Sequence, residues 1–150
     1  HGPLAGLEFQ KYIEQKAYKM GGGQFKVPAQ NLLDYLEEKQ SDALNASSYY
    51  PGKTSVDLNL LYPEAINFRL REGLRAITKK LKGFDHQDAV VTAPESRTSA
   101  PVRIPRTADL HHTEISNLYP CGEGAGYAGG IISAGLDGVR VVKAIKKIKG

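Results

Sequence analysis

Glycines near the carboxyl end of the chain are spaced so that backbone N–H groups can approach a phosphate closely. Residues 124–129 read Gly-Ala-Gly-Tyr-Ala-Gly, follow a predicted strand at 118–121 and open a predicted helix from about Gly129 to Lys147. The amino end of a helix favours an anion because its N–H groups are free and its dipole is positive there. Glu123 lies between two glycines at the end of the strand. A carboxylate there suits a sugar-like polyol, so the segment predicts a site for a ligand with both a polyol and an anion.

Two well-known phosphate motifs do not explain this segment. A dinucleotide-binding fold needs a second strand that ends in an acid about 20 residues further on. Here residues 143–150 are rich in lysine and contain no acid. A P-loop needs Gly-Lys-Ser or Gly-Lys-Thr after the glycines, and this sequence has neither. The glycines could instead serve close packing of the helix against the strand, for which Gly129 and Gly130 would be useful. That alternative does not explain the acid Glu123 between two glycines.

Apolar residues at helical spacing predict the helices that would position this segment. One stripe runs from Phe9 to Met20 and ends at three glycines, and residues 31–38 favour a short helix. A further helix is expected to begin at Pro63 and to close at Gly83. Its predicted inward stripe consists of Ile66, Leu70, Leu74, Ile77 and Leu81. The final helix is apolar on most sides as far as Val142, so we expect it to be buried.

Short runs of β-prone residues predict a small sheet. Residues 89–92 and 101–105 are expected to be strands, and pairing between them is one arrangement. The polar segment 40–60 is expected to be a long loop that is functional or mobile, or that conceals a short element. The predicted fold class is therefore α+β, with helices packed on a small sheet.

Composition and charge limit the class of protein. The 150 residues are 41% hydrophobic and 24% charged, which is typical of one globular domain. The sequence contains no apolar run long enough to span a bilayer and no leader segment, so we expect no membrane partner. Cys121 is the single cysteine, which favours a cytoplasmic protein. The net charge is +4. Lysines near the end, at 143, 146, 147 and 149, are interpreted as a solvated helix end, so no nucleic-acid partner is expected; a weak nucleic-acid binder, with affinity that falls with salt, remains a rival.

No metal site is expected from the histidines and the cysteine. His111 and His112 are adjacent and lack further ligands at suitable spacing, which favours an ordinary loop pair. His86 lies in a loop and carries little weight as a proton donor. Cys121 has no partner cysteine, so a buried, small hydrophobic role is predicted for it.

Two long segments resemble a known family. Residues 117–141, from Asn-Leu-Tyr-Pro-Cys-Gly-Glu-Gly to Gly-Val-Arg-Val, resemble the terminal flavin motif of the bacterial NAD(FAD)-utilising dehydrogenases. Residues 94–104, Pro-Glu-Ser-Arg-Thr-Ser-Ala-Pro-Val-Arg-Ile, resemble that family's E-T-R-T-S-S-P-V-R-I stretch. With Glu8-Phe-Gln and the segment 21–30, the resemblance extends over nearly the whole chain.

This resemblance implies roles for named residues. Glu123 would hydrogen-bond the ribityl chain of FAD. Gly122, Gly124 and Gly126 would allow close backbone approach. Gly129, Gly130 and Ile131 would bring the helix end near the flavin ring edge or the pyrophosphate.

The segment 97–103 is implied as the substrate side. Arg97 and Arg103 would face the flavin or clamp an anionic substrate, and an ion pair of Arg97 with Glu95 is an equal alternative. Thr98 and Ser99 would bond the ring edge, or would cap the local turn.

The resemblance also implies that the chain is half of a site. The family's own amino-terminal Gly-x-Gly-x-x-Gly is absent, so residues 3–113 are assigned to a substrate-side (cap) domain and 114–150 to the carboxy-terminal part of an FAD-binding domain. FAD would be held only with the missing amino-terminal part, with NAD(P) as a candidate redox partner and an unknown small-molecule substrate. We expect the isolated chain to be non-catalytic and to self-associate through its unpaired edge. The alternative is a stand-alone phosphate-ligand binding or interaction module without redox chemistry.

Overall fold

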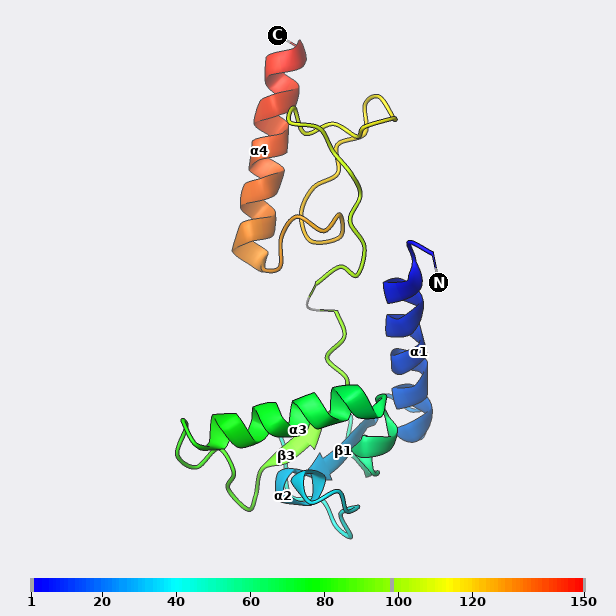
Figure 1. Cartoon of the computed structure of the whole chain (residues 1–150), viewed down its shortest axis with the longest axis vertical. Coiled ribbons are helices and arrows are strands. Elements are labelled where there is room, and N and C mark those ends of the chain that lie inside the picture. Colours follow the sequence, from blue (N-terminus) through cyan, green and yellow to red (C-terminus); the bar gives the residue numbers. More distant parts are fainter. Residues whose placement is uncertain (1, 98, 150) are drawn as a thin grey trace. The chain divides into compact units, whose positions relative to one another are not determined.

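The computed structural model describes residues 2–97 and 99–149 and contains two compact units. Residues 11–94 form the first, which we call the sheet unit. The described residues before 11 and after 94 form the second, the glycine-loop unit. The helices are α1 (Ala5–Met20), α2 (Leu32–Leu36), α3 (Glu64–Thr78) and α4 (Ile131–Lys149), and the strands are β1 (Val27–Asn31), β2 (Lys53–Ser55) and β3 (Val90–Thr92) (Figure 1). The predicted α+β class is confirmed.

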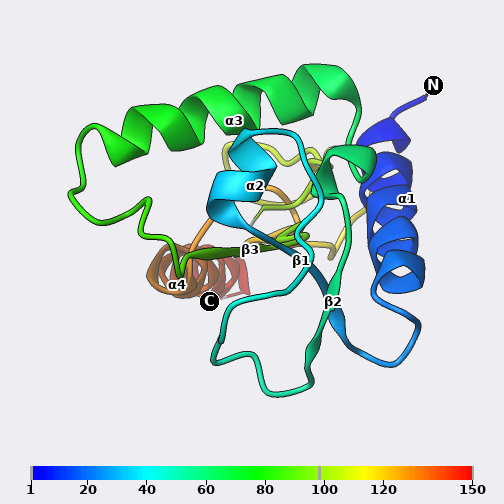
Figure 2. The ribbon, with the colours of Figure 1, turned by 90° about the horizontal axis from the view of Figure 1, so that it is seen from below.

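A three-stranded mixed sheet organises the sheet unit, with β1 between β2 and β3 (Figure 2). β1 is parallel to β2 and antiparallel to β3. Pro28 lies in this central strand and has no N–H, but its carbonyl still accepts from Ala93 N at 3.2 Å. The buried side chain of Gln30 links the strand to its surroundings, because its amide donates to Lys39 O at 2.6 Å and accepts from Leu58 N at 2.8 Å. The central strand therefore organises the unit through both its backbone and a side-chain amide.

Several predicted elements are confirmed. The α1 stripe is correct in its second half, where Ile13 and Ala17 are each only 2% exposed and pack with Tyr35 and Leu61. The short helix at 31–38 appears as α2, and the strand at 89–92 as β3. The segment 40–60 does conceal short elements, since it contains β2 and a 3-10 turn at Leu58–Leu60.

The predicted inward stripe of α3 is wrong for most of its members, although Leu74 does pack against the core. Leu70, Ile77 and Leu81 are 41%, 38% and 57% exposed, and the helix ends at Thr78 rather than at Gly83. The buried residues of α3 are Asn67 and Arg71. The face that packs inward is polar because it satisfies hydrogen-bonding groups of the 3-10 turn, and periodicity alone does not reveal that demand.

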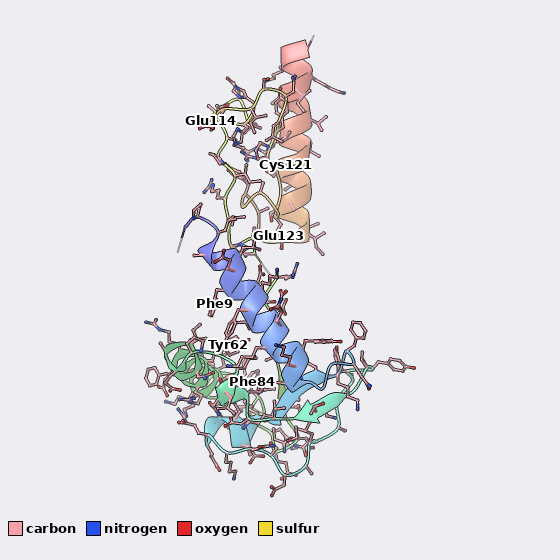
Figure 3. The ribbon with its side chains drawn as sticks, turned by 90° about the vertical axis from the view of Figure 1, so that its right-hand side faces the viewer. Phe9, Tyr62, Phe84, Glu114, Cys121 and Glu123 are labelled. Atoms are coloured by element: carbon pink, nitrogen blue, oxygen red, sulfur yellow. The ribbon has the colours of Figure 1, made fainter. Side chains whose placement is uncertain are left out.

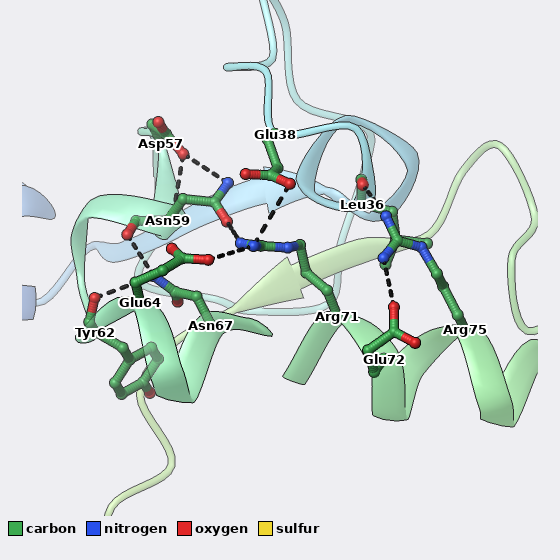
Figure 4. A network of polar contacts seen from close by, with 10 residues as sticks. All are labelled: Leu36, Glu38, Asp57, Asn59, Tyr62, Glu64, Asn67, Arg71, Glu72 and Arg75. Carbon is green, nitrogen blue, oxygen red and sulfur yellow. Dashed lines mark hydrogen bonds and ion pairs between the residues drawn. The ribbon is translucent and has the colours of Figure 1, made fainter. Parts of the chain in front are cut away.

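Arg71 is the centre of this polar face (Figure 4). Its guanidinium donates to the side chain of Asn59 in the 3-10 turn, lies 2.7 Å from Glu64 and 3.5 Å from Glu38, and is only 4% exposed. Asn67 donates from the same face to the carbonyl of Asn59. The network thus fastens α3 to two other segments of the sheet unit.

The two predicted strands of the glycine-loop unit are wrong. Residues 101–105 and 118–121 are irregular. Their backbone groups have other partners: Ile104 N donates to Ala125 O at 3.1 Å, Leu118 O accepts from His112 N at 2.7 Å, and Pro120 O accepts from an arginine side chain. Prolines at 101, 105 and 120 also remove N–H donors that a ladder needs.

The expected burial of the final helix is also wrong. Within the described residues, Asp137 and Val141 are the buried positions of α4. Several of its large apolar side chains are exposed by at least half: Ile131 91%, Ile132 77%, Leu136 61%, Val139 51% and Val142 53%. The apolar face is present as predicted, but no described residue of the glycine-loop unit covers it. None of the described helices is both long and apolar enough to cross a membrane.

Arg71→Lys should destabilise the sheet unit, because an ammonium cannot bond Asn59 and two carboxylates with the fixed fork of a guanidinium. We expect a loss of about 1–3 kcal/mol in the free energy of unfolding, measured by urea titration followed by circular dichroism. Arg69→Lys, an exposed arginine of the same helix, is the control and should change stability by less than about 0.5 kcal/mol. Equal effects of the two substitutions would contradict the role given to Arg71.

Candidate functional site

An ion pair between Arg106 and Asp137 holds the glycine-loop unit together. The guanidinium donates to both carboxylate oxygens at 2.8 Å, and the two side chains are 9% and 7% exposed. The hydrogen bonds from Arg106, with a further one from Gly122 N, lower the pKa of Asp137 from an ordinary 3.8 to about 2, although burial opposes this. The same pair raises the pKa of Arg106. Both groups are therefore charged at neutral pH.

Both members of the pair also bind backbone groups around the glycines. Arg106 donates to Pro120 O at 2.9 Å, and Asp137 accepts from Gly122 N at 2.9 Å. The pair thus fixes the start of the glycine-rich segment to α4 and to the chain after Pro105. Sequence analysis did not single out either residue. An acid at 137 within an otherwise apolar helix was the available signal, because such an acid needs a partner.

The glycine-rich segment forms tight turns, and its glycines differ in how much space surrounds them. Gly126 N donates to Glu123 O at 2.8 Å and Tyr127 N to Gly122 O at 3.0 Å. Gly126 has φ +80°, and a Cβ there would lie 2.6 Å from Val102 O. A Cβ on Gly124 would meet nothing within 4 Å. Position 126 therefore requires glycine for packing, whereas position 124 faces open space.

Tyr127 connects the segment to two arginines. The centre of its ring lies 3.6 Å from the guanidinium carbon of Arg106 and 4.3 Å from that of Arg103. Its hydroxyl donates to Ile104 O at 3.0 Å. Arg103 is thus held against an aromatic ring.

A hollow of about 260 Å³ gathers several predicted site residues of the glycine-loop unit. Glu123 and Gly124 line one part of it, and Arg97 and Ser99 line another. Glu123 lies beside the amino-terminal end of α4, and Glu114 lies toward the other end of that helix (Figure 3). The hollow is smaller than the roughly 300–1,000 Å³ of a complete small-molecule site, so it can enclose only part of a large cofactor.

Sequence analysis missed two residues that line this hollow, Leu7 and Gln10 at the start of α1. The side-chain amide of Gln10 donates to Ser96 O, directly before Arg97. A Cβ on Gly6 would lie 3.0 Å from Pro101 O, so this part of α1 packs closely on the segment. The helical stripe that predicted α1 did not show this second contact surface.

The other predicted site residues have varied positions. Gly129 lies next to Ser99, since a Cβ on this glycine would be 3.5 Å from the serine hydroxyl. Gly130 O accepts from Ala134 N at 2.9 Å as α4 begins, and Ile131 is 91% exposed. Arg103 does not line the hollow. Thr98 lies outside the described residues.

The ring nitrogens of two histidines accept hydrogen bonds from backbone N–H groups close by in the chain. The Nδ1 atom of His112 accepts from the backbone N–H groups of Glu114 and Ile115 at 3.1 and 3.0 Å. His86 Nδ1 accepts from Asp88 N at 3.3 Å. Within residues 2–97 and 99–149, no group of three or more His, Cys, Asp or Glu residues could hold a metal ion.

Cys121 is exposed, so the prediction of a buried role for it is wrong (Figure 3). The expected burial assumed that residues 118–121 form a covered strand. In the structure this segment is irregular, and Pro120, whose carbonyl accepts from Arg106, is its buried residue.

Comparison with known proteins gives two matches. A family model described as "FAD-dependent protein, C-terminal domain-like" matches residues 1–98. An uncharacterized protein of Clostridium beijerinckii is 43% identical over 145 residues, which are 95% of this chain and 27% of that relative. The chain therefore spans about a quarter of the relative's length. The glycine-rich segment lies beyond the family match but within a chain that the relative matches almost completely.

Asp137 should make the glycine-loop unit sensitive to acid. Its pKa in the folded protein is lower than its ordinary value, so its stabilising contribution is complete above about pH 4 and is lost as the pH falls through about 2. That contribution is about 2 kcal/mol. Asp137→Asn should lower stability at neutral pH and flatten the decline toward acid, as measured by urea unfolding across pH with amide exchange of Gly122 as the local probe. Asp109→Asn, an exposed acid of the same unit, should behave as the unchanged chain; a steep acid decline in Asp137→Asn would refute the assignment.

Proposed function

We propose that this chain, which belongs to the FAD-dependent protein, C-terminal domain-like family, forms one wall of a flavin site in a longer oxidoreductase. The observation that carries the proposal is the hollow where Glu123, Ser99 and Arg97 meet beside the amino-terminal end of α4. The relative's greater length supports the view that other parts of the protein form the remaining walls.

The residues around the hollow fit a group that combines a polyol with an anion. Glu123 offers carboxylate oxygens that accept hydrogen bonds from hydroxyl groups. The first N–H groups of α4 have no partner within the helix, so that end favours negative charge. Gly124 faces open space, so a ligand can approach the backbone there. The hollow's volume of about 260 Å³ suits a part of FAD, which agrees with a site shared between two parts of a protein.

We assign a role to each residue on this basis. Glu123 binds the ribityl hydroxyls, while Gly122, Gly124 and Gly126 shape the turn that presents it. Gly129, Gly130 and Ile131 form the positive end of α4 beside them. When bound, FAD supplies the hydride-accepting ring that side chains cannot provide.

Arg97 and Ser99 form the substrate side of this proposal. The guanidinium of Arg97 can orient an anionic group, and the hydroxyl of Ser99 lies close to the beginning of α4. Arg103, held on Tyr127, is a second cation for the substrate, and Thr98 belongs to the same stretch. An unknown small molecule is the proposed substrate, with NAD(P) as the redox partner. We further propose that residues 3–113 are the cap-domain portion and 114–150 the flavin-domain portion of a cytoplasmic protein.

The exposed apolar face of α4 supports the need for a missing part. Ile132, Leu136 and Val139 follow one another at spacings of four and three residues, which places them on one side of the helix. Such a face is costly in water and is typical of a surface that another element covers. We assign it to the amino-terminal part of the longer protein, or in the isolated chain to self-association.

Glu123→Ala should weaken FAD binding when the chain is combined with that amino-terminal part. Loss of a charged hydrogen-bond acceptor corresponds to about 10–100-fold in affinity. The measurement is a titration of FAD followed by visible absorbance, with Glu114→Ala as the matched control that should bind normally. The isolated chain should stay colourless. Failure of the combined protein to take up FAD would sink the proposal and favour a stand-alone phosphate-binding module.

Leu136→Lys should separately weaken the association of this chain with the amino-terminal part of the longer protein, because it places a charge on the apolar face of α4. Leu136→Met keeps the face apolar and should associate normally. Sedimentation of the mixed parts without FAD checks this outcome. Normal association of Leu136→Lys would show that the face is not the contact.

A further inference from the structure

One end of the sheet unit carries exposed aromatic rings among lysines. The parallel strands β1 and β2 begin there, and α1 ends there. The rings come from three separate segments of the chain, and a lysine adjoins the rings of each segment or follows within three residues. We call this the aromatic–lysine surface, and its members are Tyr18, Lys19, Phe25, Lys26, Tyr50 and Lys53.

Hydrogen bonds hold the three segments together at this surface. Val27 N donates to Gly52 O at 3.0 Å, and the Thr54 hydroxyl donates to Gly21 O at 2.7 Å. The Tyr49 hydroxyl donates to the carbonyl of Phe25 at 3.1 Å. The surface is therefore built by the fold and is not a set of loose side chains.

Two of the rings are largely exposed to solvent. Tyr50 is 99% exposed and Phe25 is 77% exposed. Phe25 also has φ +60°, a conformation that glycine adopts readily and a bulky residue only at a cost. Its ring meets that of Tyr18 edge-on, with centroids 6.4 Å apart. A turn that needed only its geometry would carry glycine at position 25, so the ring itself calls for a reason.

The charge around these rings is positive. Residues 15–33 and 43–56 contain no aspartate or glutamate. Among the residues that the structure describes, Lys19, Lys26 and Lys53 form no ion pair. The nearest acid along α1 is Glu14, which lines a hollow with Tyr18 and Lys19. Cores of protein–protein interfaces are depleted in lysine, so this combination points to a partner that is itself anionic.

We propose that the aromatic–lysine surface binds single-stranded nucleic acid. Unpaired bases stack on exposed aromatic rings, and lysines neutralise the phosphates between them. This inference goes beyond the proposed flavin function and does not depend on it. The lysines at 143–149 predicted no nucleic-acid partner, because they lack aromatic neighbours. The surface now identified is assembled from segments that are up to 35 residues apart.

The test is fluorescence anisotropy of a labelled oligothymidylate titrated with the complete chain. We expect binding that weakens as salt rises and that is stronger than binding to duplex DNA of equal charge. Phe25→Gly removes the ring while suiting the backbone at φ +60°, so it should fold normally and bind roughly 5–100-fold more weakly. Tyr50→Ala should do the same without disturbing any packing. Phe84→Ala, in the loop after α3 and 37% exposed, should bind as the unchanged chain.

Three results would overturn the proposal. Unchanged binding in both Phe25→Gly and Tyr50→Ala would remove the rings from the contact. Equal binding of duplex DNA would show attraction to phosphate alone. Competition by polyglutamate as strong as that by the oligonucleotide would indicate an acidic protein partner instead.

Discussion

The bidentate ion pair between Arg106 and Asp137 takes the place of a sheet in the glycine-loop unit. Residues 99–130 contain no strand or helix in the structure, and their backbone pairing is limited to an isolated antiparallel bridge between Arg106 and His112 and a few turn and loop hydrogen bonds. Instead two nearly buried charged groups contact the loop. The guanidinium of Arg106 donates to the carbonyl of Pro120 and lies over the ring of Tyr127, and the carboxylate of Asp137 accepts from an amide N–H. The turn that presents Glu123 starts at the amide that Asp137 holds. The geometry of the proposed flavin wall therefore depends on one charged contact between positions 31 residues apart.

The sequence was a good guide where local chemistry decides the structure. The glycines after Met20 end α1, the β-prone run at 89–92 forms β3, and the acid flanked by glycines does line a hollow. Periodicity located the helices α3 and α4 and their apolar residues, but it assigned those residues to buried faces that most of them do not occupy. The spacing of apolar residues does not show which surface packs against a helix, because it depends only on the residues of the helix itself. In α3 a polar network around Arg71 occupies the inner face, and in α4 large apolar side chains such as Ile132 and Leu136 are exposed.

Long-range contacts account for the parts of the site that sequence could not supply. Leu7 and Gln10 reach the hollow from a segment about 90 positions earlier in the chain than Arg97, and no local pattern links them. The predicted strands at 101–105 and 118–121 failed for a related reason. Their β-prone residues had no partner strand. Their carbonyls instead accept hydrogen bonds from the Arg106 side chain and from the backbone N–H of His112. A strand is a property of a pair, so a single sequence segment cannot establish it.

The two inner glycines of the loop differ in how freely they can change during evolution. A side chain at position 126 would collide with the backbone of Val102, so selection for a folded loop acts against every substitution there. Position 124 borders the hollow with open space around it, so variants at this site keep the fold. Descendants of one ancestor can therefore alter the shape of the proposed ligand wall at position 124 while position 126 stays fixed. The loop thus separates a residue that the packing holds fixed from one that borders the hollow and is free to vary, and they are only two positions apart.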